Sequence, residues 1–172
     1  MKIIFLDHQG VMYTRKHPNP GKLDDFDMKT VKELNSILEL DSSIELVVSS
    51  DWKYWVDFEE MCRFYVKQGL KAPIAYTPKT LNYTYSIYNQ QRAKEIKAWL
   101  NNNQDLNITH WVAIDDMDMR DHLDNFVWIN QVQDGITQSG AKELLLQHLI
   151  NSSSANPADS SQDARRRSPH RS

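Results

Sequence analysis

Three short apolar runs, each ending on a polar side chain, constrain the fold of this chain more than any other feature. The runs and the residues that follow them are 2–6 with Asp7, 44–48 with Ser49 and Ser50, and 111–114 with Asp115 and Asp116. Runs of this length and composition are typical of strands buried in a parallel sheet. Because open α/β sheets build their sites where the carboxyl ends of the strands meet, we expect these polar side chains to converge.

Strand and helix patterns alternate along the chain. Strands are predicted at 2–6, 44–48, 72–76, 110–114 and 126–129, and helices at 28–40, 52–68, 90–103 and 139–150. Strands separated by helices indicate an α/β fold, a Rossmann-like parallel sheet with helices on both faces. The intervals 10–27 and 77–89 are too short to form a large cap domain.

Residues 151–172 differ from the rest in composition. They include no Leu, Ile, Val, Phe, Tyr or Trp and are rich in Ser and Arg. Such a segment cannot bury enough apolar surface to offset the entropy lost on ordering, so we expect one domain at 1–150 followed by a disordered tail. The arginines at 165–167 and Arg171 could contact phosphates or an acidic partner, although a solvated tail is the simpler interpretation.

Charge and cysteine content narrow the partners and the compartment. The net charge is -3 overall and about -5 over residues 1–150, which argues against a broad nucleic-acid-binding surface. Cys62 is the only cysteine, which fits a reducing compartment. No apolar stretch approaches the roughly 20 residues that span a bilayer, and no signal-peptide pattern is present at residue 1. We therefore expect a cytoplasmic protein.

The polar strand ends meet the requirements of Mg²⁺-assisted phosphoryl transfer. Mg²⁺ prefers oxygen ligands, usually one or two carboxylates with waters and a substrate phosphate. Asp7, Asp115 and Asp116 supply carboxylates, and Asp7 could also attack phosphorus to form an aspartyl-phosphate. Ser50, with Ser49 as the reserve candidate, could hold a phosphoryl oxygen.

A cation is also needed to balance charge on the phosphoryl oxygens. The candidates are Arg92, Lys94 and Lys97, in or near the first turns of the helix that precedes the third apolar run. The five tryptophans, by contrast, are interpreted mostly as core side chains rather than as surfaces for base stacking.

Taken in order, these motifs resemble those of the haloacid dehalogenase (HAD) superfamily. Its first motif, Asp-x-Asp-Gly-x after an apolar strand, is similar to residues 7–11. Its second, a Ser or Thr at a strand end, matches Ser49 and Ser50, and its fourth, an apolar run and then Asp-Asp, matches residues 112–116. The resemblance covers about residues 2–150.

A narrower resemblance is to a small capless branch, the HAD domain associated with RNA-repair proteins. The patterns of that branch run roughly Ser-Ser-Trp-Arg, Lys-Gly-x-x-Ile-x-x-Trp-Leu and Gly-Leu-Thr, and the similar segments here are 49–53, 92–100 and 135–137. The resemblance implies a Mg²⁺-dependent phosphoric ester hydrolase or phosphotransferase. An open site without a large cap suits a macromolecular phosphorylated substrate, such as a nucleic-acid end or a phosphoprotein.

The resemblance also implies a role for each matching residue. Asp7 would be nucleophile and metal ligand, Gln9 a ligand through its backbone carbonyl, and Ser50 the phosphoryl holder. Asp115 and Asp116 would complete the metal site.

One departure from the HAD pattern bears on activity. Gln9 stands where the superfamily has its general acid and base, an aspartate, and an amide cannot exchange protons near neutral pH. Loss of such a group typically removes about 10²–10⁴-fold of rate. His8 is not a replacement, because alternation along an extended segment points it away from the Asp7–Gln9 face. Two functions therefore stay open: a weakened enzyme, or a catalytically impaired HAD-like module that binds metal or regulates a partner.

Overall fold

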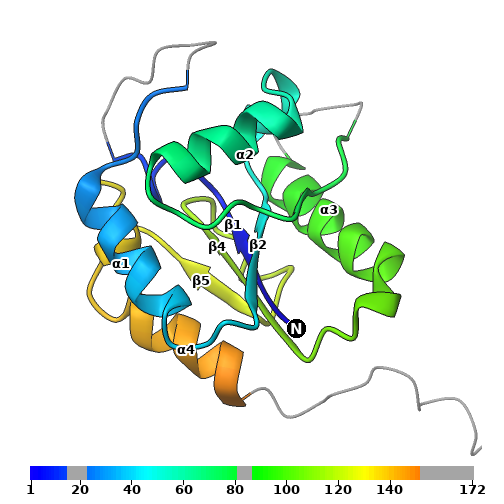
Figure 1. Ribbon diagram of the computed structural model, residues 1–172. Coiled ribbons are helices and arrows are strands. Elements are labelled where there is room, and N and C mark those ends of the chain that lie inside the picture. Colours follow the sequence, from blue (N-terminus) through cyan, green and yellow to red (C-terminus); the bar gives the residue numbers. More distant parts are fainter. Residues whose placement is uncertain (15–22, 81–86, 152–172) are drawn as a thin grey trace, which may run out of the picture.

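In the part of the chain that the computed structural model describes, residues 1–14, 23–80 and 87–151, five parallel strands form one sheet (Figure 1). The strands are β1 (Lys2–Leu6), β2 (Ile44–Val48), β3 (Ala75–Tyr76), β4 (His110–Asp115) and β5 (Phe126–Trp128). They lie in the order β3-β2-β1-β4-β5. The predicted Rossmann-like α/β fold without a large cap is confirmed.

Helices cover both faces of this sheet. They are α1 (Met28–Leu38), α2 (Phe58–Lys67), α3 (Tyr88–Asn102) and α4 (Ala141–Asn151), with short 3₁₀ turns η1 (Asp51–Tyr54), η3 (Gln104–Leu106) and η4 (Gly135–Thr137). Side chains of β1 alternate between the two faces. Ile4 and Leu6 pack in the larger core with residues of α1, α2 and α4, whereas Ile3 and Phe5 pack in the smaller core with residues of α3.

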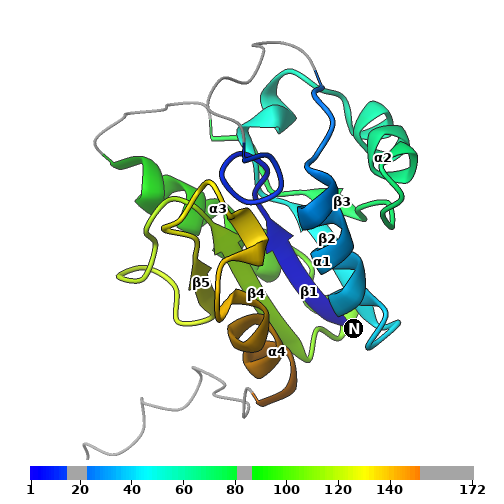
Figure 2. The ribbon, with the colours of Figure 1, turned by 90° about the vertical axis from the view of Figure 1, so that its left-hand side faces the viewer.

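The register of the central strands sets the position of the site. Leu6 at the end of β1 lies opposite Val48 of β2 and Ile114 of β4, so the residues that follow each strand lie level with one another. After β3 the chain crosses to the other side of β1, and the strand order reverses between β1 and β4. Ligands of open α/β sheets bind at such a switch point. In Figure 2 the loop after β1 curls over this end of the sheet.

Two predicted elements differ from the structure. The helix predicted at 52–68 is wrong, because η1 ends before α2 begins and Asp57 caps α2 by accepting a hydrogen bond of 2.8 Å from the amide of Glu60. The strand predicted at 72–76 shortens to its last two residues. Pro73 lies in the lost part and has no amide to donate to a neighbouring strand.

The predicted tail at 151–172, except for Asn151, lies outside the described residues, as do parts of the intervals 10–27 and 77–89. Among the described helices, none has the length and apolar character needed to cross a membrane.

Candidate active site

The loop after β1 brings Asp7 to the end of the sheet and then turns back at once. The His8 carbonyl accepts a hydrogen bond of 2.8 Å from the amide of Tyr13, which closes the loop. Gly10, inside the loop, has φ of +73°, a backbone conformation that favours glycine. A Cβ at Gly10 would also collide with the carboxylate of Asp116. Glycine here therefore allows the loop and that carboxylate to approach each other.

A second glycine supports the same loop from η4. Gly135 has φ of +60°, and a Cβ there would collide with the carbonyl oxygen of Val11. The next amide, of Ile136, donates a hydrogen bond of 2.9 Å to that carbonyl. The segment 135–137, which resembles a family pattern, thus holds the loop that carries Asp7.

Three carboxylates meet at the ends of β1 and β4. Oxygen atoms of Asp7, Asp115 and Asp116 all lie within 4.8 Å of one another. The first two side chains are buried and the third is half-buried. Carboxylate oxygens are the ligands that Mg²⁺ prefers in proteins, so this cluster could hold a metal ion.

The pKa values of all three carboxyl groups are raised. Burial raises the pKa of Asp7 to about 7, against the lowering effect of the Arg92 guanidinium. Burial, with the charge of Asp7, raises the pKa of Asp115 well above its usual range, and burial also raises the pKa of Asp116. Buried acids with raised pKa values beside a pocket are typical of functional sites. A cation would favour their charged forms, so these residues fit a metal ion.

Arg92 of α3 joins the three strand ends. Its Nη1 donates to Oδ1 of Asp7 at 3.2 Å, to Oδ2 of Asp115 at 2.9 Å and to the Ser49 carbonyl. Its Nη2 donates to Oδ1 of Asp51 at 2.7 Å. The Arg92 side chain is 2% exposed, so its bonds to Asp7, Asp115 and the Ser49 carbonyl operate away from bulk water, where charge-assisted hydrogen bonds are strong.

The other candidate cations lie elsewhere. Lys94 and Lys97 are exposed on α3, and neither lines the pocket beside Asp7. The geometry therefore favours Arg92 as the cation next to a phosphoryl group.

His8 lies on the opposite side of the loop from the pocket. Its Nε2 is 2.7 Å from the Tyr65 hydroxyl, and its ring packs against Phe26 and Trp52. Burial lowers the pKa of His8 to about 3, so the ring is neutral at ordinary pH. His8 is therefore not placed to donate a proton in the pocket.

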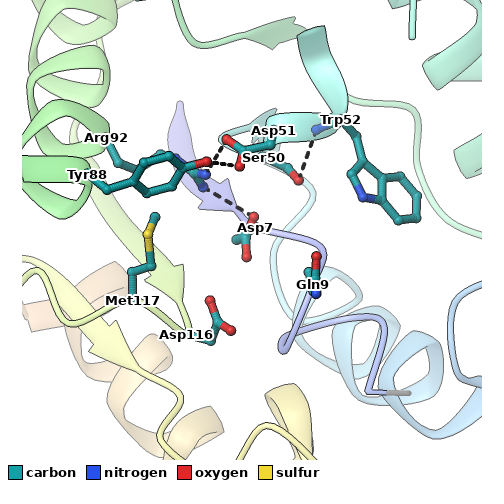
Figure 3. A pocket seen from close by; sticks show the side chains of 9 residues that line it. All are labelled: Asp7, Gln9, Ser50, Asp51, Trp52, Tyr88, Arg92, Asp116 and Met117. Atoms are coloured by element: carbon teal, nitrogen blue, oxygen red, sulfur yellow. Dashed lines mark hydrogen bonds and ion pairs between the residues drawn. The ribbon is translucent and has the colours of Figure 1, made fainter. Parts of the chain in front are cut away.

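The pocket at this end of the sheet has a volume of about 110 Å³ (Figure 3). Its lining residues are Asp7, Gln9, Ser50, Asp51, Trp52, Tyr88, Arg92, Asp116 and Met117. Gln9 is exposed at its edge, and the Ser50 hydroxyl accepts a hydrogen bond of 3.5 Å from the amide of Trp52. The Ser49 hydroxyl is buried without a hydrogen-bond partner among the described residues and does not line the pocket.

Comparison with known families decides the class of this protein. The model of the HAD domain in Swiss Army Knife RNA repair proteins matches residues 3–141, which is more than half of the chain. The chain belongs to this HAD family. No curated protein and no solved structure matches it. The resemblance to the HAD domain associated with RNA-repair proteins is thereby confirmed, and family membership supports a phosphatase or phosphotransferase in general terms.

Four residues that line the pocket of this HAD domain were not among the predicted site residues: Asp51, Trp52, Tyr88 and Met117. Asp51 accepts hydrogen bonds from Arg92 and from the Tyr88 hydroxyl, as Figure 3 shows. Asp51 had a signal in the sequence, because it is an extra carboxylate relative to the Ser-Ser-Trp-Arg pattern. Tyr88 had none, since it lies in the interval 77–89, outside every predicted strand and helix.

The tryptophans are mostly core side chains, as predicted, with one exception. Trp52 and Trp99 are buried, as expected, and Trp111 and Trp128 are partly buried. Trp55 is 42% exposed, because it lies in the break between η1 and α2 rather than within a helix that packs on the sheet.

Proposed function

We propose that this HAD domain is a Mg²⁺-dependent phosphatase or phosphotransferase that acts through an aspartyl-phosphate on Asp7. The observation that carries the proposal is the convergence of three carboxylates, within 4.8 Å of one another, beside the buried guanidinium of Arg92. Phosphoryl transfer depends mainly on positioning and charge neutralisation, and this arrangement offers both.

The metal would be held by Asp7, Asp115 and Asp116, with the backbone carbonyl of Gln9 as a further ligand. When bound, Mg²⁺ would offset negative charge on the phosphoryl oxygens. The chemistry of the donor set supports this choice, because all the ligands are hard oxygen atoms.

The protein's own residues would carry the transfer. A carboxylate oxygen of Asp7 would bond to phosphorus while the bond from phosphorus to the leaving oxygen breaks, and that oxygen takes the electron pair. Arg92 would balance charge on the phosphoryl oxygens, and the Ser50 hydroxyl would donate to one of them. Water, or another acceptor, would then attack phosphorus and release Asp7.

Proton transfer to the leaving oxygen is the step that this site supports least. A leaving oxygen needs a proton, and the Gln9 amide does not supply one near neutral pH. We therefore infer turnover that is about 10²–10⁴-fold below that of a domain with a positioned acid at this place.

The size of the pocket and the lack of a large cap over the described residues indicate the class of substrate. A volume of about 110 Å³ suits a phosphoryl group rather than a whole small molecule, and no large cap is present in the described residues. A macromolecule with an accessible phosphate, such as a nucleic-acid end, fits this opening. The family description, which mentions RNA repair, favours the same class. A cytoplasmic location and a tail that contacts an acidic partner remain part of the proposal.

Gln9 also favours a second candidate function. A HAD domain that has lost its general acid can keep the metal site and act as a binding or regulatory module. In that case the carboxylate cluster would bind Mg²⁺ without turnover.

A phosphatase screen in Mg²⁺ separates the two functions. It compares wild type, Gln9→Asp, Asp7→Asn and the double variant, with Gln133→Asp as a matched change at an exposed position outside the pocket. A weakened enzyme gains about 10²–10⁴-fold in Gln9→Asp, loses that gain in the double variant, and shows no gain in Gln133→Asp. Background activity throughout would favour the binding module. Strong wild-type turnover that survives Asp7→Asn would refute both functions.

A further inference from the structure

A second and larger hollow adjoins the carboxylate pocket. It has a volume of about 380 Å³, and its lining is formed by Asp51, Tyr54, Trp55 and Tyr88. We call it the aromatic groove. Trp55 is 42% exposed and Tyr54 is 38% exposed, so two large rings of one short segment meet solvent. Exposed aromatic surface gathered in a hollow is typical of a binding site.

The aromatic groove is continuous with the carboxylate pocket. Asp51 and Tyr88 line both hollows. We call these two residues the polar seam, because the Asp51 carboxylate and the Tyr88 hydroxyl lie where the two hollows meet and are hydrogen-bonded to each other. One ligand could therefore extend from the carboxylates, past the polar seam, to the aromatic rings.

We propose that the aromatic groove holds the base of a nucleotide whose phosphate occupies the carboxylate pocket. This inference rests on the proposed function, and it assigns the substrate class. A nucleotide has the same order of parts as the site: a phosphate, then a sugar with hydroxyls, then a flat ring system. The Asp51 carboxylate, which accepts from Arg92 and Tyr88, is a hydrogen-bond acceptor where the two hollows meet, the place that the sugar hydroxyls would occupy.

The polar seam favours a nucleotide over phosphotyrosine. In phosphotyrosine the ring is bonded directly to the phosphate oxygen, so no hydroxyl-bearing link would meet Asp51 and Tyr88. In a nucleotide the sugar separates the phosphate from the base.

The charge of the chain favours recognition of one terminal nucleotide. Residues 1–150 have a net charge of about -5, so attraction to many backbone phosphates cannot supply the affinity. Stacking of a base on aromatic rings does not need a basic surface.

Trp55 is the clearest residue with which to test the groove. The Tyr54 hydroxyl is bound to Glu95 Oε1 at 3.1 Å, and the Tyr88 hydroxyl is bound to Asp51, so changes at either would disturb the structure. Trp55 packs against the Trp52 ring with centroids 5.4 Å apart and keeps much of its surface in solvent. Trp55→Ala should therefore fold, while Trp55→Phe keeps a ring for stacking.

Calorimetric titration in Mg²⁺ tests the proposal with five small ligands: a nucleoside 5′-monophosphate, a nucleoside 3′-monophosphate, ribose 5-phosphate, an unphosphorylated nucleoside and free phosphotyrosine. We expect at least one monophosphate to bind wild type roughly 5- to 100-fold more tightly than ribose 5-phosphate. Trp55→Ala should remove most of that difference and Trp55→Phe should retain it. Leu144→Ala, which truncates a similarly exposed apolar side chain on α4 away from both hollows, should leave it unchanged.

The outcomes distinguish failure of the groove from failure of the phosphoryl site. Equal binding of the monophosphates and ribose 5-phosphate, unaffected by Trp55→Ala, would overturn the groove and leave the phosphoryl site standing. Binding of the unphosphorylated nucleoside that depends on Trp55, with no gain from a phosphate, would sustain the groove and contradict the proposed function. Tighter binding of free phosphotyrosine than of either monophosphate, lost in Trp55→Ala, would overturn the nucleotide as occupant.

Discussion

Two buried ionic clusters lie three residues apart on α3, and they differ in how completely their charges are matched. In the first, Arg92 meets Asp7, Asp51 and Asp115 at the end of the sheet. In the second, Lys53 of η1 meets Glu95 with Nζ and Oε2 2.5 Å apart, and both side chains are almost wholly buried.

The second cluster is balanced and closed. Lys53 Nζ also donates to the Thr77 hydroxyl at 2.8 Å and to the Pro78 carbonyl at 3.1 Å, which matches the three protons of an ammonium group. The Glu95 carboxylate accepts in addition from the Tyr54 hydroxyl and from Thr80. This pair fastens η1 to α3 and so fixes the segment that carries Ser50 and Asp51.

The first cluster has a surplus of carboxylates and borders a pocket. One guanidinium faces several acids, and the pKa values of Asp7, Asp115 and Asp116 are raised, mainly by burial. The difference shows how charge balance can distinguish a buried ionic cluster that holds the fold together, which we call a structural joint, from one that forms a binding site. A matched pair holds elements together, whereas a surplus of one charge beside a pocket favours an ion or a substrate of the opposite charge.

The largest effect expected from this comparison is on stability. Lys53→Met should lower the free energy of unfolding by about 3–5 kcal/mol, because it leaves the Glu95 carboxylate buried without its cation. Urea denaturation measures this loss, and Lys32→Met, at an exposed position on α1, should stay within about 0.5 kcal/mol of wild type. Changing both partners, in Lys53→Met with Glu95→Met, should recover much of the loss. A loss in Lys53→Met no larger than in Lys32→Met would show that the pair is not a structural joint.

The cluster around Arg92, which has a surplus of carboxylates and which we call the surplus cluster, should make the free energy of unfolding depend on pH. The pKa of Asp7 is about 7 in the folded protein and near 4 when unfolded, so the folded state holds the proton more tightly. This group therefore stabilises the metal-free fold at low pH, and its contribution is lost as pH rises from about 4 through about 7. The neighbouring acids shift in the same direction.

Melting temperatures at pH 5 and pH 8 in a chelator test this second expectation. Wild type should lose more stability between these values than Asp7→Asn, which cannot ionise at that position. Mg²⁺ at pH 8 should raise the melting temperature of wild type more than that of the variant. Parallel pH profiles for the two proteins would contradict a surplus of charge at Asp7.

A smaller effect is expected at the glycine that faces the surplus cluster. Gly10 and Gly69 both have positive φ, +73° and +79°, but only Gly10 has a neighbour, Asp116, where a Cβ would lie. Alanine at either position should cost about 1–2 kcal/mol for the left-handed backbone. Gly10→Ala should cost more and should also weaken Mg²⁺ binding, because Asp116 must move. Equal losses of stability and unchanged Mg²⁺ affinity in both variants would show that the close approach does not matter.

The sequence predicted those parts of the site that follow from buried strands. Asp7, Ser50 and Asp115 each follow an apolar run, and parallel pairing brings such residues to one edge regardless of how the helices pack. Arg92 could be predicted only as one of three cations. Which side chain reaches the sheet depends on where α3 begins and how it is rotated, and it begins at Tyr88 rather than at 90.

The balanced pair and the aromatic groove could not be predicted in this way. Lys53 and Glu95 are 42 residues apart, and no local pattern links them. The exposure of Trp55 was hidden because apolar residues at helical spacing continue through the break between η1 and α2. Asp57 followed by Glu60 was the available signal, since an acidic cap with a glutamate three residues on is typical of a helix start.

Calorimetric titration of Mg²⁺ tests the central claim, a metal site formed by Asp7, Asp115 and Asp116, most directly. It compares wild type with Asp115→Asn and Asp116→Asn, and uses Asp118→Asn as the matched control, a partly exposed aspartate paired with Arg120 outside the cluster. We predict that each change within the cluster weakens Mg²⁺ binding about tenfold or more, while Asp118→Asn leaves the affinity at the wild-type value. Equal Mg²⁺ affinity in all four proteins would contradict the assignment of the metal site.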